Sequence, residues 1–221
     1  MRKIFLLLSV VVSVSLHAQF GYYEQGTEAE RLVMSGIMAQ NYGDYERAIY
    51  YYEEATKRDS KYADAYYYWG SALTALAVQD DNEDFFKKSF EKYKQATKLD
   101  SKRSEFYNDW AYSLMELAKM KDNIKPYQYE AENLLKKTEQ LGEQMGAYNL
   151  ACLFSLANNK KKAIEWLNTM MTKEYDKKMD ELSRTNFDED KDFDNIRQET
   201  EFRQFLNKYF PGELPKSFHS M

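Results

Sequence analysis

The feature that most constrains the fold is a segment, residues 43–55, whose pattern returns along most of the chain. Two glycines flank it, Gly36 and Gly70, and their separation matches the length of one class of helix-turn-helix repeat. The apolar residues between them recur at steps of three and four, the period of one face of a helix; they are Leu32, Ile37, Tyr45, Ala48, Ile49, Tyr52 and Ala55. The pattern predicts two closely packed helices separated by a turn at residues 41–44, with Asp44 capping the second helix.

Further copies of this unit follow. Residues 55–61 return as residues 96–102, and the same offset relates Trp69 to Trp110. A third, partial return lies within residues 148–167. Tandem recurrence of a unit that predicts two helices indicates a helical array in which each unit packs on its neighbours.

These residues resemble the tetratricopeptide repeat (TPR) family over roughly two thirds of the chain. On that family's frame the repeats occupy 29–62, 63–103, 104–143 and 144–177. The first repeat has Leu32, Gly36, Ala39, Gly43, Tyr45, Ala48, Tyr52 and Ala55 at the expected positions, and later departures are Ser60 for proline, Ala111 for glycine and Thr138 for alanine. The resemblance implies an all-α fold, a right-handed α-solenoid of about four TPR-like repeats with a C-terminal capping helix; a non-repetitive helical bundle is the alternative.

The second and third repeats are longer than the first. The additional residues fall between the two helices of each repeat, at 78–84 and 120–126. Insertions of this kind map to one face of a solenoid. We expect helix extensions that stand side by side, capped by residues 80–84 and by Pro126. They are either a solvated elaboration or a second contact ridge.

The segment after the repeats, 178–210, resembles the closing element that follows TPR arrays. Its apolar residues Phe193, Ile196, Phe202, Phe205 and Leu206 are predicted to cover the last repeat. Residues 211–221 are predicted to be a tail. Asp188, Asp190, Asp192 and Glu199 imitate the spacing of a calcium loop, but Phe193 stands where such a loop needs glycine. The capping interpretation is therefore favoured.

Residues 1–18 have the pattern of a secretory signal peptide. A basic start is followed by a short apolar run and by Ala18, after which cleavage is predicted. The apolar run is short for a membrane span, although an uncleaved anchor is the alternative. We expect a periplasmic or secreted protein with a lead-in at 19–28 and no stable membrane insertion after cleavage. The single cysteine, Cys152, excludes a disulfide within the chain.

The charge balance argues against two classes of partner. Loss of residues 1–18 removes two of the 31 basic residues and none of the 36 acidic ones, which changes the net charge from −5 to −7. Nucleic acid and anionic lipid both need a basic surface. Neither is therefore an expected partner, and the sequence carries no signal of oligomeric state.

Catalysis is not expected. The only histidine after the leader is His219, in the predicted tail, so a hydroxyl or thiol nucleophile has no histidine base in the core. Paired cysteines, a histidine pair for zinc and a glycine-rich phosphate loop are absent from the sequence, so no metal or cofactor is predicted. Cys152 is interpreted as a small buried apolar residue, with a reactive thiol as the alternative.

The resemblance further implies a concave groove lined by the first helix of each repeat. The residues that would face it are Glu30, Gln40, Asn41, Asp64, Tyr67, Glu105, Asn108, Tyr112, Glu116 and Tyr148, with Asp109 and Asn149 beside them. Such a groove would be acidic and rich in tyrosine. The TPR clamp for C-terminal carboxylates is disfavoured, because its basic positions hold Val33, Glu105 and Asp109.

The function predicted from this groove is that of a protein-interaction adaptor. An extended partner segment containing Lys or Arg would pair with the acids and contact the tyrosine rings through cation–π interactions. Alternatively, Tyr67 and Tyr112 pack against neighbouring helices. Two rival functions remain: a module that binds cell-wall or glycan chains by stacking on the tyrosines, and a structural module whose own tail, 207–221, fills the groove.

Overall fold

The computed structural model describes residues 26–174 and 183–212, which leaves the predicted leader, most of the lead-in and the end of the tail outside the described residues. All regular structure in these ranges is helical, which confirms the all-α class. The elements are α2 (Glu28–Asn41), α3 (Tyr45–Arg58), α4 (Ala63–Asp80), α5 (Glu83–Leu99), α6 (Ser104–Met120), α7 (Lys125–Gln140), α8 (Gln144–Leu156), α9 (Lys160–Thr172), α10 (Arg184–Glu189), the 3-10 turn η1 (Lys191–Phe193) and α11 (Thr200–Tyr209).

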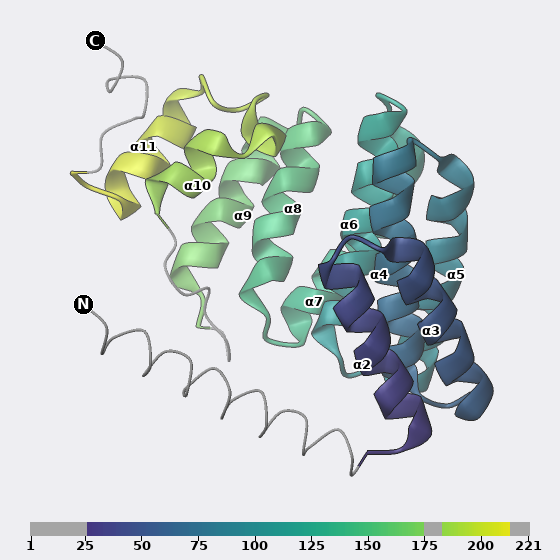
Figure 1. Ribbon diagram of the computed structural model, residues 1–221. Helices are drawn as coiled ribbons and strands as arrows, with labels where there is room; N and C mark the ends of the chain where they lie inside the picture. The colour runs from purple at the N-terminus through teal and green to yellow at the C-terminus, as the bar shows by residue number, and fades with distance from the viewer. Residues whose placement is uncertain (1–25, 175–182, 213–221) are drawn as a thin grey trace, which may run out of the picture.

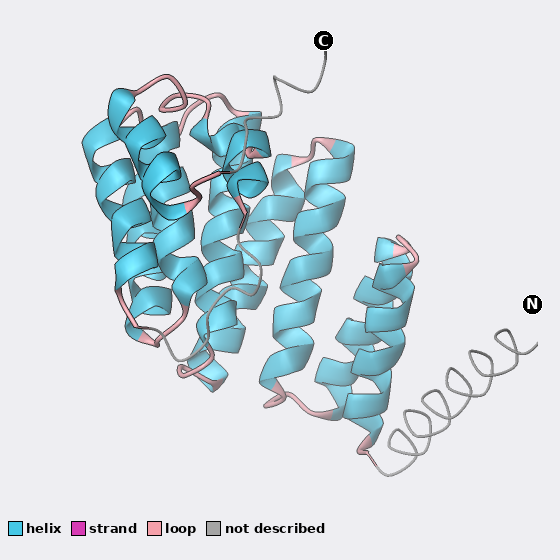
Figure 2. Cartoon of the chain, turned by 90° about the vertical axis from the view of Figure 1, so that its left-hand side faces the viewer, coloured by secondary structure: helices cyan, strands magenta, loops and turns pink. Residues whose placement is uncertain are grey.

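Helices α2 to α9 pack as four consecutive pairs, and each pair packs on the next (Figure 1). The first helices of successive pairs also contact one another, α2 with α4, α4 with α6 and α6 with α8. They therefore form a continuous row along one side of the array. Figure 2, turned by 90°, shows the same stacked helices from one end of the array to the other.

Glycine allows the closest approach within the first two pairs. A Cβ added at Gly36 would overlap the ring of Tyr52, and one at Gly70 would lie 3.0 Å from the ring of Tyr93. Both rings are buried, so neither can move aside freely. The turn before α3 is also as predicted, because Asp44 Oδ1 accepts a hydrogen bond of 3.1 Å from the backbone N–H of Arg47.

The insertions in the second and third repeats are helix extensions that stand side by side, as predicted. Ala77, Phe86 and Leu117 form a separate small core between the extended ends of α4, α5 and α6. Lys121 and Glu83 form an ion pair that joins the two turns at the tips. Asn82 caps α5, and a proline lies in the first turn of α7.

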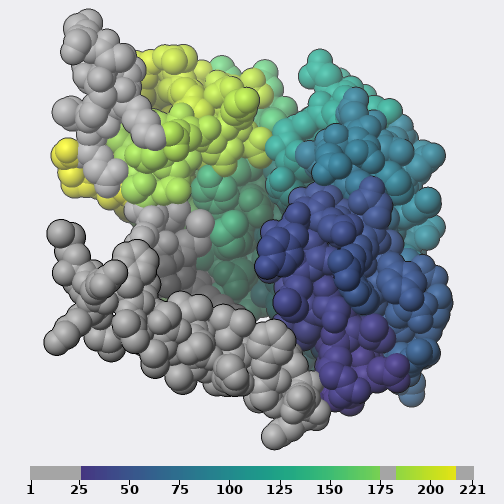
Figure 3. All heavy atoms as spheres, in the orientation of Figure 1, coloured from purple at the N-terminus to yellow at the C-terminus, as the bar shows by residue number. Residues whose placement is uncertain are grey.

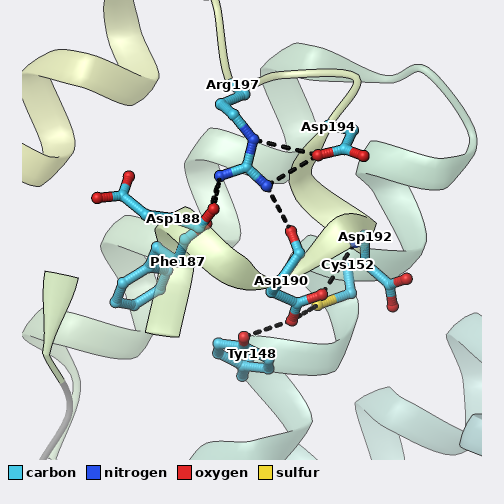
Figure 4. A network of polar contacts seen from close by, with 8 residues as sticks. All are labelled: Tyr148, Cys152, Phe187, Asp188, Asp190, Asp192, Asp194 and Arg197. Atoms are coloured by element: carbon cyan, nitrogen blue, oxygen red, sulfur yellow. Dashed lines mark hydrogen bonds and ion pairs between the residues drawn. The ribbon is translucent and has the colours of Figure 1, made fainter. Parts of the chain in front are cut away.

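The closing element, residues 183–210, covers the α8/α9 pair with a cluster of aromatic and aliphatic side chains. All five apolar residues predicted for this role are buried, and Phe187 and Phe210 join them. Arg197 holds the segment that links α10 to η1 by donating hydrogen bonds to the backbone carbonyls of Phe187, Asp188 and Asp190 (Figure 4). One guanidinium thus bonds two carbonyls of the last turn of α10, which have no partner further along that helix, and the carbonyl of Asp190, from which η1 begins.

Candidate functional site

Two hollows lie next to each other along the row of first helices. Figure 3 shows the surface hollowed between the N-terminal repeats and the closing element. The first hollow, of about 420 Å³, is bounded by α6, α8 and residues 190–192, and we call it the terminal hollow. The second, of about 380 Å³, lies between α4 and α6, and we call it the middle hollow. Asp109 and Tyr112 of α6 line both, so the two are parts of one groove.

The wall of the terminal hollow is built by a contact between α8 and the closing element. The hydroxyl of Tyr148 donates a hydrogen bond of 2.6 Å to Asp190 Oδ2, and the thiol of Cys152 lies 3.9 Å from the same oxygen (Figure 4). Asp190 Oδ1 accepts the backbone N–H of Asp192 at 2.9 Å, which caps η1. Burial is the main cause that raises the pKa of the Cys152 thiol, followed by the charges of Asp190 and Asp192. The thiol therefore stays protonated and unreactive near neutral pH.

A lysine lies at the mouth of the terminal hollow. The ammonium of Lys119 pairs with Glu116 on its own helix and, at 3.0 Å, with Asp192 of the closing element. It also lies 6.0 Å from the centre of the Tyr112 ring. Burial lowers the pKa of Lys119, but the two carboxylates outweigh it, so the pKa is raised overall and the ammonium stays charged.

A chain of polar contacts crosses the floor of the groove from α4 to α8. The Tyr67 hydroxyl donates to Asp109 Oδ2 at 2.7 Å, the Asn108 amide donates to Asp109 Oδ1 at 3.2 Å, and the Asn149 amide donates to Asn108 Oδ1 at 2.8 Å. Burial raises the pKa of Asp109, although its two hydrogen bonds oppose this. The Tyr67 ring also stacks on Phe106 at 4.8 Å between centroids.

Comparison with known proteins bears on the fold alone. No protein-family model and no curated protein matches the sequence. Among solved structures, the chain is similar to a crystal structure described as a thermophilic TPR protein in Thermus thermophilus, with a TM-score of 0.54 and 16% identity over 65% of this chain and 73% of that one. The chain has a TPR fold. The predicted TPR-like α-solenoid is therefore confirmed.

Half of the predicted site residues lie together around the terminal hollow. Six of them line the terminal hollow, namely Asn108, Asp109, Tyr112, Glu116, Tyr148 and Asn149. The others lie elsewhere. Glu30 accepts the backbone N–H of Thr27 and closes the cap of its own helix, while Asn41 lies exposed at the end of α2. Gln40 donates to Ser71 and accepts from Tyr52.

The predicted acidic character of the TPR groove is only partly present, because two cations that the sequence analysis did not place in the groove lie there. Arg103 bridges Asp64 and Glu105, and Lys119 bridges Glu116 and Asp192. Four carboxylates still line the terminal hollow against two ammonium groups, those of Lys119 and Lys191. The terminal hollow therefore keeps an excess of negative charge.

The two tyrosines for which alternatives were open behave differently. Tyr67 packs against neighbouring aromatic rings and is tied to Asp109, so it belongs to the floor of the groove. Tyr112 keeps 46% of its surface exposed between the two hollows. Of the two, only Tyr112 therefore offers a ring face to a ligand.

The closing element supplies groove residues that the sequence analysis assigned to capping alone. The contacts Tyr67–Asp109 and Tyr148–Asp190 both span the same separation along the chain, and both tyrosines hold the same position in their repeats. Asp190 therefore takes the place of the carboxylate of a further repeat. The shared offset was a signal available in the sequence.

The aspartates of the imitated calcium loop have separate partners. Asp188 pairs with Arg184, Asp190 binds Tyr148, and Asp192 pairs with Lys119. Across residues 26–174 and 183–212, no three His, Cys, Asp or Glu side chains converge as metal ligands. In the same ranges no helix has both the length and the apolar composition needed to cross a membrane.

Proposed function

We propose that this TPR solenoid is a protein-interaction scaffold that binds an extended, basic segment of a partner protein along α4, α6 and α8. The observation that carries the proposal is the terminal hollow, where an exposed aromatic ring, side-chain amides and an excess of carboxylates converge. Each of these groups matches one component of an extended basic segment.

The carboxylates favour a cationic side chain in the ligand. The ammonium of Lys119 already occupies a position between Glu116, Asp192 and the Tyr112 ring, so the site has room for a cation. An arriving Lys or Arg would share these acids or replace Lys119, and Tyr112 would add a cation–π contact. The gain would come from charge pairing and would therefore weaken with salt.

The amides favour a polypeptide backbone beside that cation. In the described part of the chain, Asn149 donates to Asn108, while no hydrogen bond reaches Asn149 Oδ1. A carbonyl oxygen facing the groove can accept a backbone N–H of an extended segment. Backbone recognition of this kind gives affinity without demanding one particular sequence.

The role we propose is binding rather than catalysis, outside the cytoplasm. Cys152 is 1% exposed and its raised pKa keeps the thiol protonated, so it is no nucleophile. The pattern of residues 1–18 supports secretion into the periplasm or beyond. A partner would then meet a mature chain with net charge −7 from 29 basic and 36 acidic residues.

The test is binding of three sets of short labelled peptides, rich in Lys and Arg, neutral, or rich in Glu, measured by fluorescence anisotropy at low and high salt. We expect the basic set to bind and to weaken with salt. Tyr112→Ala should weaken it about tenfold, while Tyr129→Ala, which removes a tyrosine that is 79% exposed on α7, should have no effect. Equal binding of all three sets, or of both variants, would contradict the proposal. Binding of wall glycans that resists salt and needs Tyr112 would favour the glycan function instead.

A further inference from the structure

The outer face of the first helix pair presents large side chains and a hollow of its own. A stripe along α2 and its C-terminal cap, formed by Arg31, Ser35, Met38 and Tyr42, lies beside Arg47 and Tyr51 of α3. We call these six residues the open end. Met38 is 48% exposed and Tyr42 is 87% exposed. A hollow of about 270 Å³ lies between the two helices at this face.

Later repeats show what normally covers these positions. At the offset that relates Gly36 to Gly70, Arg31, Met38 and Tyr42 correspond to Ala65, Ala72 and Leu76, which are 0%, 0% and 3% exposed. Ala65 and Ala72 belong to the core shared with Tyr52 and Ala55 of the preceding second helix, α3. In α4 this face is therefore covered by a helix of the preceding repeat. In α2 the corresponding helix is missing from the described residues.

The hollow at the open end lies where later repeats place a tryptophan side chain. Ser35 corresponds to Trp69 in the second repeat and to Trp110 in the third. The Trp69 ring packs against the core between the first two repeats, and the ammonium of Lys92 lies over it, 3.6 Å from the ring centre. Ser35 removes that ring from the first repeat and leaves the space between Met38 and Tyr51 unfilled.

The charge of the open end differs from that of the rest of the acidic chain. Within the described residues, neither Arg31 nor Arg47 takes part in an ion pair: Arg31 donates to the carbonyl of Gly26, and Arg47 donates to the Tyr51 hydroxyl. Two guanidinium groups beside a hollow are complementary to carboxylates on a partner. Arginine and tyrosine are also among the residues that carry most binding energy at protein interfaces.

We propose that the open end docks an amphipathic helix of a partner protein that carries an aromatic side chain flanked by carboxylates. The helix lies on α2 as α3 lies on α4. Its aromatic ring enters the hollow beside Ser35, and its carboxylates pair with Arg31 and Arg47. This surface is separate from the groove, so a scaffold of this kind holds two partners, a basic segment in the groove and an acidic helix at its end.

The test uses the mature full-length chain and labelled peptides long enough to form a helix, followed by anisotropy. One peptide has a single tryptophan flanked by glutamates; the matched peptides replace the tryptophan by alanine, or the glutamates by lysines. We expect the first to bind and the others to be about tenfold weaker. Ser35→Trp, which restores the residue of the later repeats, should weaken the first peptide about tenfold by filling the hollow. Arg47→Glu should weaken it and reduce its salt dependence, and Tyr129→Ser should change nothing.

Three results would overturn the proposal. The first is equal binding of the three peptides, or binding that Ser35→Trp and Arg47→Glu leave unchanged. The second is concentration-dependent dimerisation in sedimentation that Ser35→Trp abolishes, because a second copy would then cover the face. The third is peptide binding that appears only after deletion of residues 19–25, because the chain's own lead-in would then be the occupant.

Discussion

The two ends of the array differ in whether the outward face of the terminal helix pair is covered. At the C-terminal end, the closing element buries Phe187, Phe193 and Phe202 completely. At the N-terminal end, Met38 and Tyr42 remain on the surface. The closing element therefore does more than protect the last repeat. It also brings Asp190 and Asp192 to the groove, together with Lys191, and so adds to the negative charge of the terminal hollow.

The largest expected difference between the ends is in stability. Phe193→Ala should lower the free energy of unfolding by about 3–5 kcal/mol, because it removes a fully buried ring and leaves a cavity. Tyr42→Ala, at the open end, should change it by less than about 0.5 kcal/mol. Urea unfolding followed by circular dichroism measures both. Similar losses for the two variants would mean that the ends are equally covered.

The second effect isolates the hydrogen bonds that hold the closing element in place. Arg197→Ala should cost about 2–3 kcal/mol, because three backbone carbonyls lose a charged donor. Arg197→Lys should not restore the loss, because one ammonium cannot reproduce the planar fork. Arg203→Ala is the matched control in the same element; this side chain is exposed and donates to Gln198. Thermal unfolding of the three variants would refute this account if Arg203→Ala cost as much as Arg197→Ala.

A smaller effect compares the first helix pair with the second. Gly36→Ala should destabilise the protein by about 1–3 kcal/mol, because the added methyl overlaps the buried Tyr52 ring. Gly70→Ala should cost less, since the Tyr93 ring lies 3.0 Å from the added Cβ and needs to move less. The order of the two unfolding midpoints is the test. A greater loss for Gly70→Ala would mean that the second pair is the tighter one.

The smallest effect is a difference in how stability depends on pH at a buried groove residue, Asp109, and at a residue of the helix tips, Glu83. Burial raises the pKa of Asp109 above its ordinary 3.8, so its ionisation opposes folding as pH rises through the range just above that value. The hydrogen bonds from Lys121 and Lys87 lower the pKa of Glu83 from 4.5 to about 2, so its contribution is present above pH 4.5 and is lost as pH falls toward 2.

Unfolding midpoints measured from acid to neutral pH test this contrast. Relative to wild type, Asp109→Asn should gain stability as pH rises through the range above 3.8, whereas Glu83→Gln should lose it as pH rises from 2 to 4.5. Slopes of the same sign for the two variants would contradict the assignment of Asp109 to a buried site.

The helix pairs, the closing cluster and the side-by-side extensions could be predicted because each depends on local period and on residues of one kind, such as Gly36 and Phe193. Most polar contacts of the groove could not, because they join residues far apart whose partners compete; the offset shared by Tyr67–Asp109 and Tyr148–Asp190 is the exception. Asp192 pairs with Lys119 rather than a metal, and Arg103 takes Asp64. Glu30 was predictable as a cap from the Thr27–Glu30 spacing, a signature of the capping box.

The measurement that most directly tests the central claim is a titration of mature protein, labelled at its methionine methyl groups, with a short lysine-rich peptide, followed by NMR. Met115 and Met145 line the terminal hollow, and Met38 lies at the open end. We expect saturable shifts of the Met115 and Met145 methyl signals, an unchanged Met38 signal, and loss of the shifts in Tyr112→Ala. Shifts confined to Met38, or none at Met115 and Met145 while the peptide binds, would contradict the claim.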